Sequence, residues 1–324
     1  MRLLVTGANG LLGLNLSLEA MRSHAVVGVD RGRLVGVPFE VMQLDLTNSG
    51  AIARALEVSR AETVIHCAAI ADVDACERDP ELARRLNADL PGQLASECAR
   101  RGTQLVHIST DAVFDGARPG EYTEDDEPHP RSVYAATKLA GERAVLGEHH
   151  GAIVVRVNFY GWSVTGARSL AEYFFNNLSV GKQSRGFTDV VFCPMFVSDL
   201  VAVLLRMVQH GLTGLFHAVG AEPMSKYEFG VAIARRFGFD EILIQPASVA
   251  DAGLAARRAP NLRLSIHKLS TALKAEYPRF STGMDEFYTQ FQQGYPQRIH
   301  SYQQQPSPVV EPASVDPGAK GSQE

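Results

Sequence analysis

The chain has 324 residues, of which 45% are hydrophobic, and a formal net charge of −5. It therefore has enough apolar side chains for one large domain or two modest ones, and its scattered basic residues do not predict a nucleic-acid partner. No apolar stretch approaches the roughly 20 residues that a membrane span needs, and the first residues lack the character of a signal peptide. We expect a cytoplasmic protein that binds neither nucleic acid nor a membrane.

The first predicted strand, residues 2–6, runs directly into a glycine-rich turn that is followed by a helical pattern through Met21. The glycines follow the spacing GxxGxxG rather than the usual GxGxxG. Glycines permit a tight turn and a close approach of the backbone to a pyrophosphate, which then lies at the positive end of the helix. The pattern predicts a dinucleotide site that includes Gly7, Asn9, Gly10, Leu11, Leu12 and Gly13.

The next two predicted strands, residues 25–29 and 41–44, are each followed by an acidic residue. Asp30 is placed to accept hydrogen bonds from the ribose hydroxyls of an NAD-type adenosine. Arg31 and Arg33 could instead hold a 2′-phosphate or lie in a solvated turn, so both NADH and NADPH remain open as cofactors. Asp45 could accept a hydrogen bond from adenine, and we include its neighbour Leu46 in the predicted site.

Further strands are predicted at residues 63–67, 104–108 and 153–157, with helices at 90–101 and 132–146 between them. Strands that alternate with helices imply a doubly wound parallel sheet of the Rossmann type, with ligands at the carboxyl ends of the strands. We therefore predict an α/β fold in which residues 1–157 form an NAD(P)-binding domain. His66 and His107 fall inside apolar strand patterns, so we interpret them as core residues.

Beyond this region the pattern is less regular, and residues 158–297 are predicted to form a smaller substrate-binding portion that is interleaved with the sheet. Helices are expected at residues 167–180, 198–209 and 225–237. Ser225 and Glu228 have the spacing of a capping box, which marks the start of the last of these helices. Residues 298–324 are rich in glutamine, proline and serine, and we expect a disordered tail there.

Candidate chemical residues follow the strand predicted at residues 104–108. Tyr134 and Lys138 are four residues apart on a predicted helix and therefore lie side by side, so the ammonium of Lys138 is expected to lower the pKa of the Tyr134 phenol. Thr110 could supply a hydroxyl to the same substrate oxygen. These three residues suit proton transfer coupled to redox chemistry at a C–O bond. Cys67, Cys76, Cys98 and Cys193 have no metal-ligand spacing, so we expect free thiols and no metal.

With these residues, the chain resembles the extended short-chain dehydrogenases/reductases, and more narrowly the dTDP-4-dehydrorhamnose reductase family. The resemblance covers residues 1 to about 290 and is most specific at 104–142. The matching blocks are the three glycines of the first turn, Ala68 with Ala69, residues 87–89, 107–111, 113–116, 122–125 with Pro128, and Tyr134 with 138–142. The chain departs from the family at Ala112, where an aromatic residue is common, at Asn15, where some members have a metal-binding glutamate, and in a shortened segment at residues 156–161.

The resemblance implies that Thr110, Tyr134 and Lys138 form a catalytic triad for the reduction of a nucleotide-linked 4-keto-6-deoxy sugar by NADH or NADPH. In the family, Lys138 would also hold the nicotinamide ribose, and Ala68 and Ala69 would line the cofactor. Asn87 would support the site, although it could equally be a cap at the start of a helix. Superfamily members often pair through helices that flank the sheet, which leaves a homodimer open.

Two other functions remain open at this stage. An epimerase or dehydratase of the same superfamily would hold NAD⁺ tightly and regenerate it in each turnover. The later half of the chain, at residues 226–228, Arg257, Arg258 and Pro260, also resembles the regulatory beta subunit of methionine adenosyltransferase, a non-catalytic binding protein. That subunit retains the same tyrosine and lysine, so Tyr134 and Lys138 do not exclude it.

Overall fold

A seven-stranded parallel sheet forms the centre of the protein. The computed structural model describes residues 1–253, 256, 258–274 and 276–303. The strand order is β11-β6-β5-β4-β1-β2-β3, which confirms the predicted doubly wound sheet. The strands are β1 (Arg2–Thr6), β2 (Ala25–Asp30), β3 (Glu40–Gln43), β4 (Thr63–His66), β5 (Gln104–Thr110), β6 (Ile153–Val157) and β11 (Gly214–Ala218). Strands β4 and β6, which both have neighbours on either side, are buried along their whole length, as expected for a sheet covered on both faces.

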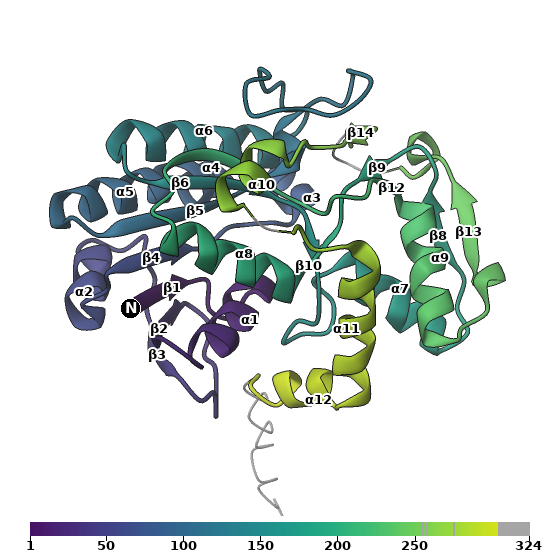
Figure 1. Cartoon of the computed structure of the whole chain (residues 1–324), viewed down its shortest axis with the longest axis horizontal. Helices are drawn as coiled ribbons and strands as arrows, with labels where there is room; N and C mark the ends of the chain where they lie inside the picture. Colours follow the sequence, from purple (N-terminus) through teal and green to yellow (C-terminus); the bar gives the residue numbers. More distant parts are fainter. Residues whose placement is uncertain (254–255, 257, 275, 304–324) are drawn as a thin grey trace, which may run out of the picture.

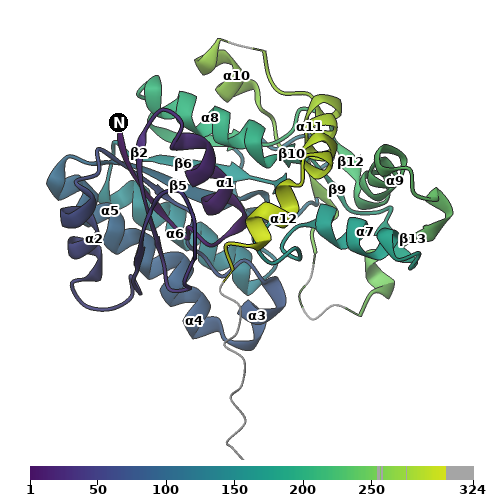
Figure 2. The same cartoon turned by 90° about the horizontal axis from the view of Figure 1, so that it is seen from below.

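Helices cover both faces of this sheet (Figure 2). Helices α1 (Leu11–Ala20) and α8 (Val197–Gln209) pack together on one face. The other face carries α2 (Ala51–Ser59), α5 (Leu90–Arg101) and α6 (Val133–Glu148). The short helices α3 (Val73–Arg78) and α4 (Pro80–Arg84) lead through the single π-helical turn η1 (Arg85–Asp89) into α5. These layers leave the carboxyl ends of the strands accessible.

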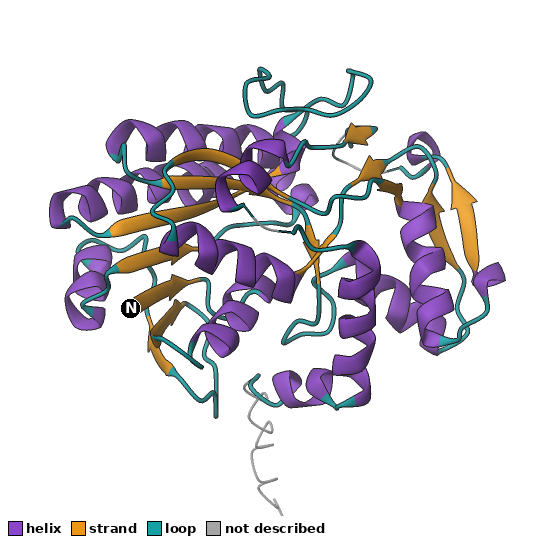
Figure 3. Cartoon of the chain, in the orientation of Figure 1, coloured by secondary structure: helices purple, strands orange, loops and turns teal. Residues whose placement is uncertain are grey.

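Most of the remaining elements form a second, smaller region beside those strand ends (Figures 1 and 3). Its helices are α7 (Leu170–Ser179), α9 (Lys226–Phe237), α11 (Phe280–Gln292) and α12 (Tyr295–His300). Its strands are β7 (Phe159–Tyr160) with β10 (Met195–Phe196), β8 (Ser184–Phe187) with β13 (Ile244–Ala247), and β9 (Val191–Phe192) with β12 (Met224–Ser225) and β14 (Asn261–Leu262). Helix α10 (His267–Leu273) packs instead against β11 of the sheet. Three short 3₁₀ turns complete the chain: η2 (Asp111–Val113), η3 (Glu241–Leu243) and η4 (Val249–Asp251).

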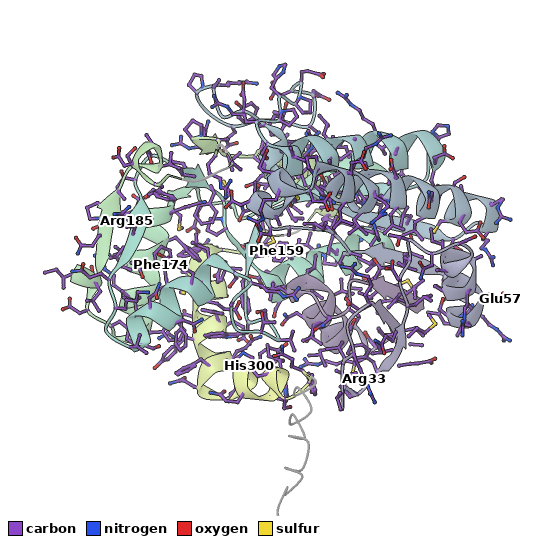
Figure 4. The ribbon with its side chains drawn as sticks, turned by 180° about the vertical axis from the view of Figure 1, so that it is seen from behind. Arg33, Glu57, Phe159, Phe174, Arg185 and His300 are labelled. Carbon is purple, nitrogen blue, oxygen red and sulfur yellow. The ribbon has the colours of Figure 1, made fainter. Side chains whose placement is uncertain are left out.

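Aromatic packing joins this region to the sheet. The Tyr160 ring lies 5.2 Å from that of Phe229 and 5.6 Å from that of Phe287, measured between ring centroids. Phe174 on α7 is completely buried in the same core. In Figure 4 the exposed residues Glu57 and Arg185 lie at opposite ends of the molecule. The core therefore runs continuously from the sheet into the smaller region.

The chain crosses between the two regions more than once. After β7 it builds α7, β8 and β9, and then returns to the sheet with α8 and β11, where Gly214 pairs with Ile153 and Ala218 with Val157. A strict boundary at residue 157 would separate β11 from the sheet to which it belongs.

Two predicted boundaries differ clearly from the structure. Helix α7 begins at Leu170 rather than at residue 167, because Ser169 and Glu172 form a capping box there. The segment beyond residue 298 was predicted to be disordered, but Arg298 lies within α12 and Tyr302 accepts a hydrogen bond from the amide of Val35 at 2.9 Å. The ordered chain therefore extends past the expected boundary because these residues pack against the loop after β2. The rest of the predicted tail, residues 304–324, lies outside the described residues.

Candidate active site

The turn after β1 is built from glycines that no larger residue could replace. Gly7 has φ +69°, and a Cβ on it would lie 2.7 Å from the amide nitrogen of Ala68. A Cβ on Gly13, in the first turns of α1, would collide with the carbonyl oxygen of Gly7. Gly10 donates its amide to that carbonyl at 2.8 Å and precedes the first residue of α1. The turn thus places backbone without side chains next to the N-terminal end of α1. This arrangement suits the binding of a pyrophosphate, because the N-terminal end of a helix carries a partial positive charge.

A pocket opens over this turn at the carboxyl ends of β1, β2 and β4. Eight of the predicted cofactor residues line it: Gly7, Gly10, Asp30, Arg31, Asp45, Leu46, Ala68 and Ala69. Six further lining residues were not predicted: Val29, Leu44, Cys67, Leu86, Leu90 and Arg168. Cys67 is signalled by its position directly before Ala68, whereas Arg168 comes from the loop before α7 and has no local signal. The pocket therefore joins distant segments around the predicted dinucleotide site.

The other predicted residues of the turn support the pocket from outside. Asn9 donates its backbone amide to Oδ2 of Asp30 at 3.0 Å. Leu11 and Leu12 are buried in the core beneath α1, and Gly13 makes the close approach to Gly7 described above. These four residues shape the turn and do not line the pocket.

The two predicted acidic residues are held by backbone amides. Asp30 accepts the amide of Gly32 at 2.8 Å through Oδ1, in addition to the amide of Asn9. Asp45 accepts both the amide and the hydroxyl of Thr47, at 2.9 and 2.7 Å, and these hydrogen bonds lower the pKa of its carboxyl group. Both carboxylates are therefore fixed in position at the wall of the pocket.

The predicted catalytic residues come together at the end of β5 and the start of α6. Ser132 caps α6 by accepting the amide of Ala135 at 3.2 Å, which fixes the turn that presents Tyr134. Part of Tyr134 remains exposed, yet burial of the phenol raises its pKa to about 12. A hydrogen bond with Thr110 opposes this rise, and the negative charge of Asp111 adds to it. At neutral pH Tyr134 therefore carries its proton.

Lys138 does not act on Tyr134 in the way that the sequence predicted. Its ammonium donates to the backbone carbonyl of Ile108 at 2.7 Å and lies 3.5 Å from Nε2 of His107. Burial lowers the pKa of Lys138 to about 8, and the negative charge of Glu142 opposes that shift. The expectation of a lowered tyrosine pKa was wrong, because burial of the phenol dominates and the lysine is directed toward β5.

Asn87 supports the site through the loop that follows Ala69. Its side chain accepts the amide of Ile70 at 2.9 Å and donates to the carbonyl of the same residue at 3.1 Å. It also donates to the hydroxyl of Thr137 on α6 at 3.3 Å. Asn87 lies inside the π-helical turn η1, so it is not a cap at a helix start. Gly141 allows α6 to approach that turn, since a Cβ there would collide with the carbonyl oxygen of Asn87.

Tyr134 lines a second, smaller pocket. The pocket is lined by Val73, Ala112, Arg131, Ser132, Tyr134, Val190, Lys226, Arg258, Ala259 and Leu262. Burial lowers the pKa of Lys226, and the positive charge of Arg258 lowers it further while Asp111 opposes the shift. Three cationic side chains thus face one small space beside the phenol.

Two acidic side chains act on the cationic residues of this pocket without lining it. Asp111, directly after Thr110, accepts a hydrogen bond from Nδ2 of Asn158 at 2.5 Å, and burial raises its pKa to about 6. Arg258 forms an ion pair with Asp74 of α3 at 3.3 Å. The charged residues that line the small pocket are all cationic.

Asn15, which replaces a family glutamate, lies within the protein core. Its amide donates to the carbonyls of Leu11 and Trp162 at 2.7 and 3.0 Å, and its oxygen accepts the hydroxyl of Tyr295 at 2.7 Å. Among the described residues, no group of three or more His, Cys, Asp or Glu side chains is arranged to hold a metal ion. No helix in the described part of the chain has the length and apolar character to cross a membrane.

Comparison with known proteins gives consistent matches over nearly the whole chain. A probable low-salt glycan biosynthesis reductase, Agl14 of Haloferax volcanii, is 33% identical over 85% of this chain and 93% of its own length. Methionine adenosyltransferase 2 subunit beta of Mus musculus is 35% identical over 88% of this chain and 86% of its own. The dTDP-4-dehydrorhamnose reductase of Mycobacterium tuberculosis is 35% identical over 84% and 87%.

The fold has a similar match among solved structures. The crystal structure of dTDP-4-dehydrorhamnose reductase from Bacillus anthracis in complex with NADP superposes with a TM-score of 0.81 at 27% identity, and covers 89% of this chain and 99% of that one. The family model described as the RmlD substrate binding domain matches residues 1–293. With the glycine turn, the sheet order and these matches in agreement, the chain belongs to the RmlD substrate binding domain family, the family of the dTDP-4-dehydrorhamnose reductases.

Proposed function

We propose that this protein is an NAD(P)H-dependent reductase of a nucleotide-linked 4-keto-6-deoxy sugar, with dTDP-4-dehydro-L-rhamnose as the first candidate substrate and dTDP-L-rhamnose as the product. One observation carries the proposal: Tyr134, hydrogen-bonded to Thr110, lines a small pocket together with three cationic side chains. A proton donor in a positively charged pocket, in a chain that also has a pocket over its glycine turn, suits the reduction of a phosphorylated carbonyl compound.

The larger pocket is assigned to the cofactor. The turn of Gly7 and Gly10 would bring a pyrophosphate close to bare backbone and to the N-terminal end of α1, and Asp30 and Arg31 lie where the adenosine ribose would be recognised. Ala68 and Ala69 line the same pocket. The related Bacillus anthracis reductase binds NADP, which supports the same cofactor class here. When bound, the reduced nicotinamide supplies the hydride for the carbonyl carbon.

Tyr134 is assigned the role of general acid. Its raised pKa, about 12, keeps the proton on the phenol until a substrate oxygen gains negative charge. The O–H bond of Tyr134 breaks and a new O–H bond forms on the sugar, so ketone and hydride become an alcohol and the phenolate remains. The Thr110 hydroxyl stabilises that phenolate by hydrogen bonding.

The cationic side chains of the small pocket are assigned to the diphosphate of the substrate. Lys226 and Arg258 are close enough for the charge of Arg258 to lower the pKa of the buried Lys226. Two like charges held near each other are destabilising unless an anion is placed between them. Arg131 adds a third positive charge at the same pocket. A nucleoside diphosphate would compensate these charges and direct the attached sugar toward Tyr134.

A second candidate is a regulatory subunit without turnover. The support for it is the similarity of 35% to methionine adenosyltransferase 2 subunit beta, which equals the similarity to the Mycobacterium tuberculosis reductase. In such a role the dinucleotide pocket would bind its ligand for stability or regulation, and Tyr134 would be retained without turnover.

The test is a direct assay of the purified protein. NADH or NADPH is mixed with dTDP-4-dehydrorhamnose, and the loss of the nicotinamide absorbance is followed. We expect oxidation that disappears in Tyr134→Phe and persists in Tyr173→Phe, since Tyr173 lies on α7 with 45% of its surface exposed. Cofactor binding with no oxidation, together with a catalytic partner recovered in stoichiometric amount, would establish the regulatory subunit instead. Co-purification of tightly held NAD⁺ with sugar turnover would indicate an epimerase or dehydratase.

A further inference from the structure

A row of buried polar side chains runs across the sheet to Lys138. Thr6 on β1 pairs in register with His66 on β4, and His66 pairs with His107 on β5. Register partners on neighbouring parallel strands point to the same face of a sheet, so the three side chains lie in one line. The line ends at the ammonium of Lys138 on α6, 3.5 Å from Nε2 of His107. All four residues are at most 2% exposed.

The contacts of Lys138 define which ring nitrogen of His107 carries the proton. At the other end of the row, the hydroxyl of Thr6 accepts the amide of Ala68 at 3.3 Å and lies 2.7 Å from Nδ1 of His66. Lys138 has only N–H donors, so Nε2 of His107 must accept and the ring proton lies on Nδ1.

Both imidazole rings remain neutral near neutral pH. Burial, together with the charge of Lys138, lowers the pKa of His66 to about 3 and the pKa of His107 well below its ordinary value. The rings stack with their centroids 5.4 Å apart. His107 is thus a permanent hydrogen-bond acceptor and does not compete with Lys138 for a positive charge.

Lys138 needs such an acceptor because it is almost completely removed from water. Its contact with the carbonyl of Ile108 uses one of three N–H groups. Within the described residues, His107 provides the side-chain acceptor for a second. The titratable groups that act on Lys138, or on which its charge acts, are Glu142 on α6, Cys67 after β4, His66 on β4 and His107 on β5.

Glu142 does not replace His107 as a direct partner. Its carboxylate accepts hydrogen bonds from Ser109 and Arg156, so its charge reaches Lys138 only through space. Cys67 has its thiol pKa raised to about 12 by burial and remains neutral. Besides the fixed backbone carbonyl of Ile108, the imidazole of His107 is therefore the group within the described residues that accepts a hydrogen bond from the amine.

We propose that His107 is a positioning residue: its neutral, Nδ1-protonated ring accepts a hydrogen bond from Lys138 and keeps that amine charged and directed toward the cofactor ribose. The inference rests on the proposed role of Lys138 in holding the nicotinamide ribose. It assigns a role in the site to a histidine that the sequence pattern placed in the core. The third N–H of Lys138 is then left for the ligand.

The test measures the dissociation constant of NADPH across pH 6 to 10 for the whole protein and its variants. His107→Phe removes the acceptor and keeps a ring of similar size, whereas His107→Gln restores an acceptor oxygen. We expect the pH at which affinity starts to fall to move down by about one unit in His107→Phe and by much less in His107→Gln. Dividing each variant's constant by the wild-type constant at the same pH removes the titration of NADPH itself.

The matched control is His217→Phe. His217 is also completely buried in the same sheet, but it lies on β11 and contacts Arg156 rather than Lys138. Its pH profile should coincide with that of the wild type. An unshifted profile in a folded His107→Phe protein would overturn the proposal, as would a wild-type affinity that does not change with pH.

A second measurement determines the protonation state of His107 in the wild-type protein, without a phenylalanine substitution in the core. In wild-type protein labelled with ¹⁵N-histidine, long-range proton–nitrogen correlation identifies the protonated ring nitrogen, and the signal lost in His107→Gln assigns the residue. We expect His107 as the neutral Nδ1–H form, and an Nε2–H or doubly protonated ring would contradict the proposal. Neither measurement uses a sugar substrate. If both succeed while no keto sugar is reduced, the proposed function fails and the role of His107 stands.

Discussion

Arg156 on β6 and Glu142 on α6 form an ion pair with 2.8 Å between Nη2 and Oε2, and only 3% of each side chain is exposed. The Ser109 hydroxyl donates to the same carboxylate at 2.5 Å, one residue before Thr110. The guanidinium also lies 4.9 Å from the centre of the Phe114 ring. Through these contacts the helix that carries Tyr134 and Lys138 is attached to the two strands beneath it.

Removal of one partner of this pair should be costly. In Glu142→Leu the guanidinium of Arg156 would remain buried without a counter-charge, so we expect the free energy of unfolding to fall by about 3–5 kcal/mol. Urea denaturation followed by circular dichroism measures the change. The control is Glu127→Leu, because Glu127 pairs with Arg143 at the surface, where the two side chains are 71% and 66% exposed, and we expect a loss below about 1 kcal/mol there. Equal effects in the two variants would contradict this account.

Tyr134→Phe removes the proposed proton donor and keeps the ring. We expect kcat to fall by about 10² or more, the scale typical of a lost general acid, while the dissociation constant of NADPH stays within about twofold. Steady-state kinetics and fluorescence titration of the cofactor measure the two quantities. A variant with wild-type turnover would refute the assigned mechanism.

Lys226→Met should weaken substrate binding more than it slows the chemical step. Because Lys226 lines the small pocket with Tyr134, we expect KM for the nucleotide sugar to rise by about tenfold or more, with a smaller change in kcat if the contact is made equally in the ground state and the transition state. Lys182→Met is the control, since Lys182 is exposed after α7 and away from the pocket. An unchanged KM would remove Lys226 from the proposed diphosphate site.

Arg31→Ala should change the preference between the two cofactors. Arg31 lines the dinucleotide pocket beside Asp30, whereas Arg33 does not. If Arg31 contacts a 2′-phosphate, its loss should weaken NADPH by about tenfold and leave NADH within about twofold, because only NADPH carries that charge. Arg33→Ala should leave both dissociation constants unchanged. Equal weakening of NADH and NADPH would mean that Arg31 contacts a part that the cofactors share.

Buried histidines should make the protein less stable in acid. Burial, and then the charge of Arg156, lower the pKa of His217 to about 3, whereas an unfolded histidine titrates near 6.5. Below pH 6.5 the unfolded chain therefore binds a proton that the folded chain does not, and stability falls by about 1.4 kcal/mol per pH unit for each such residue. Asp111, with its raised pKa, acts in the opposite direction between about pH 6 and 4.

Comparison of variants isolates the contribution of His217 to the loss of stability in acid. Between pH 6.5 and 5, the unfolding free energy of His217→Gln should decline less steeply than that of the wild type, by about 1.4 kcal/mol per pH unit. Asp111 and the other histidines cancel in that difference. His210→Gln, at an exposed position after α8, should keep the wild-type slope. Parallel curves for His217→Gln and the wild type would show that His217 titrates normally in the folded state.

Features of the site that depend on local sequence could be predicted. The glycine turn after β1 and the N-cap of α9 by Ser225 follow from short patterns whose physical requirements are local. The strand at residues 153–157 was also predicted with its observed ends, because a strand buried on both faces is a continuous apolar run. The capping box of Ser169 and Glu172 has the same spacing as that of Ser225 and was overlooked.

Features that depend on tertiary contacts could not be predicted. The spacing of Tyr134 and Lys138 indicates that they are neighbours, but not that the carbonyl of Ile108 binds the ammonium. The pKa of Tyr134 rises because of burial, which a helix pattern does not reveal. Arg168 reaches the dinucleotide pocket from the start of α7 only because the chain folds back across the strand ends.

The position of β11 at the edge of the sheet also affects how the chain can be synthesised. Strand β6 gains its outer neighbour only from residues 214–218, so a nascent chain that has emerged from the ribosome as far as Val157 presents β6 with one edge unpaired. Open strand edges of this kind promote association between chains, and pairing across such a sequence separation is slow. Between the synthesis of Val157 and that of Ala218, the outer edge of β6 is therefore the part of the sheet open to pairing with another chain.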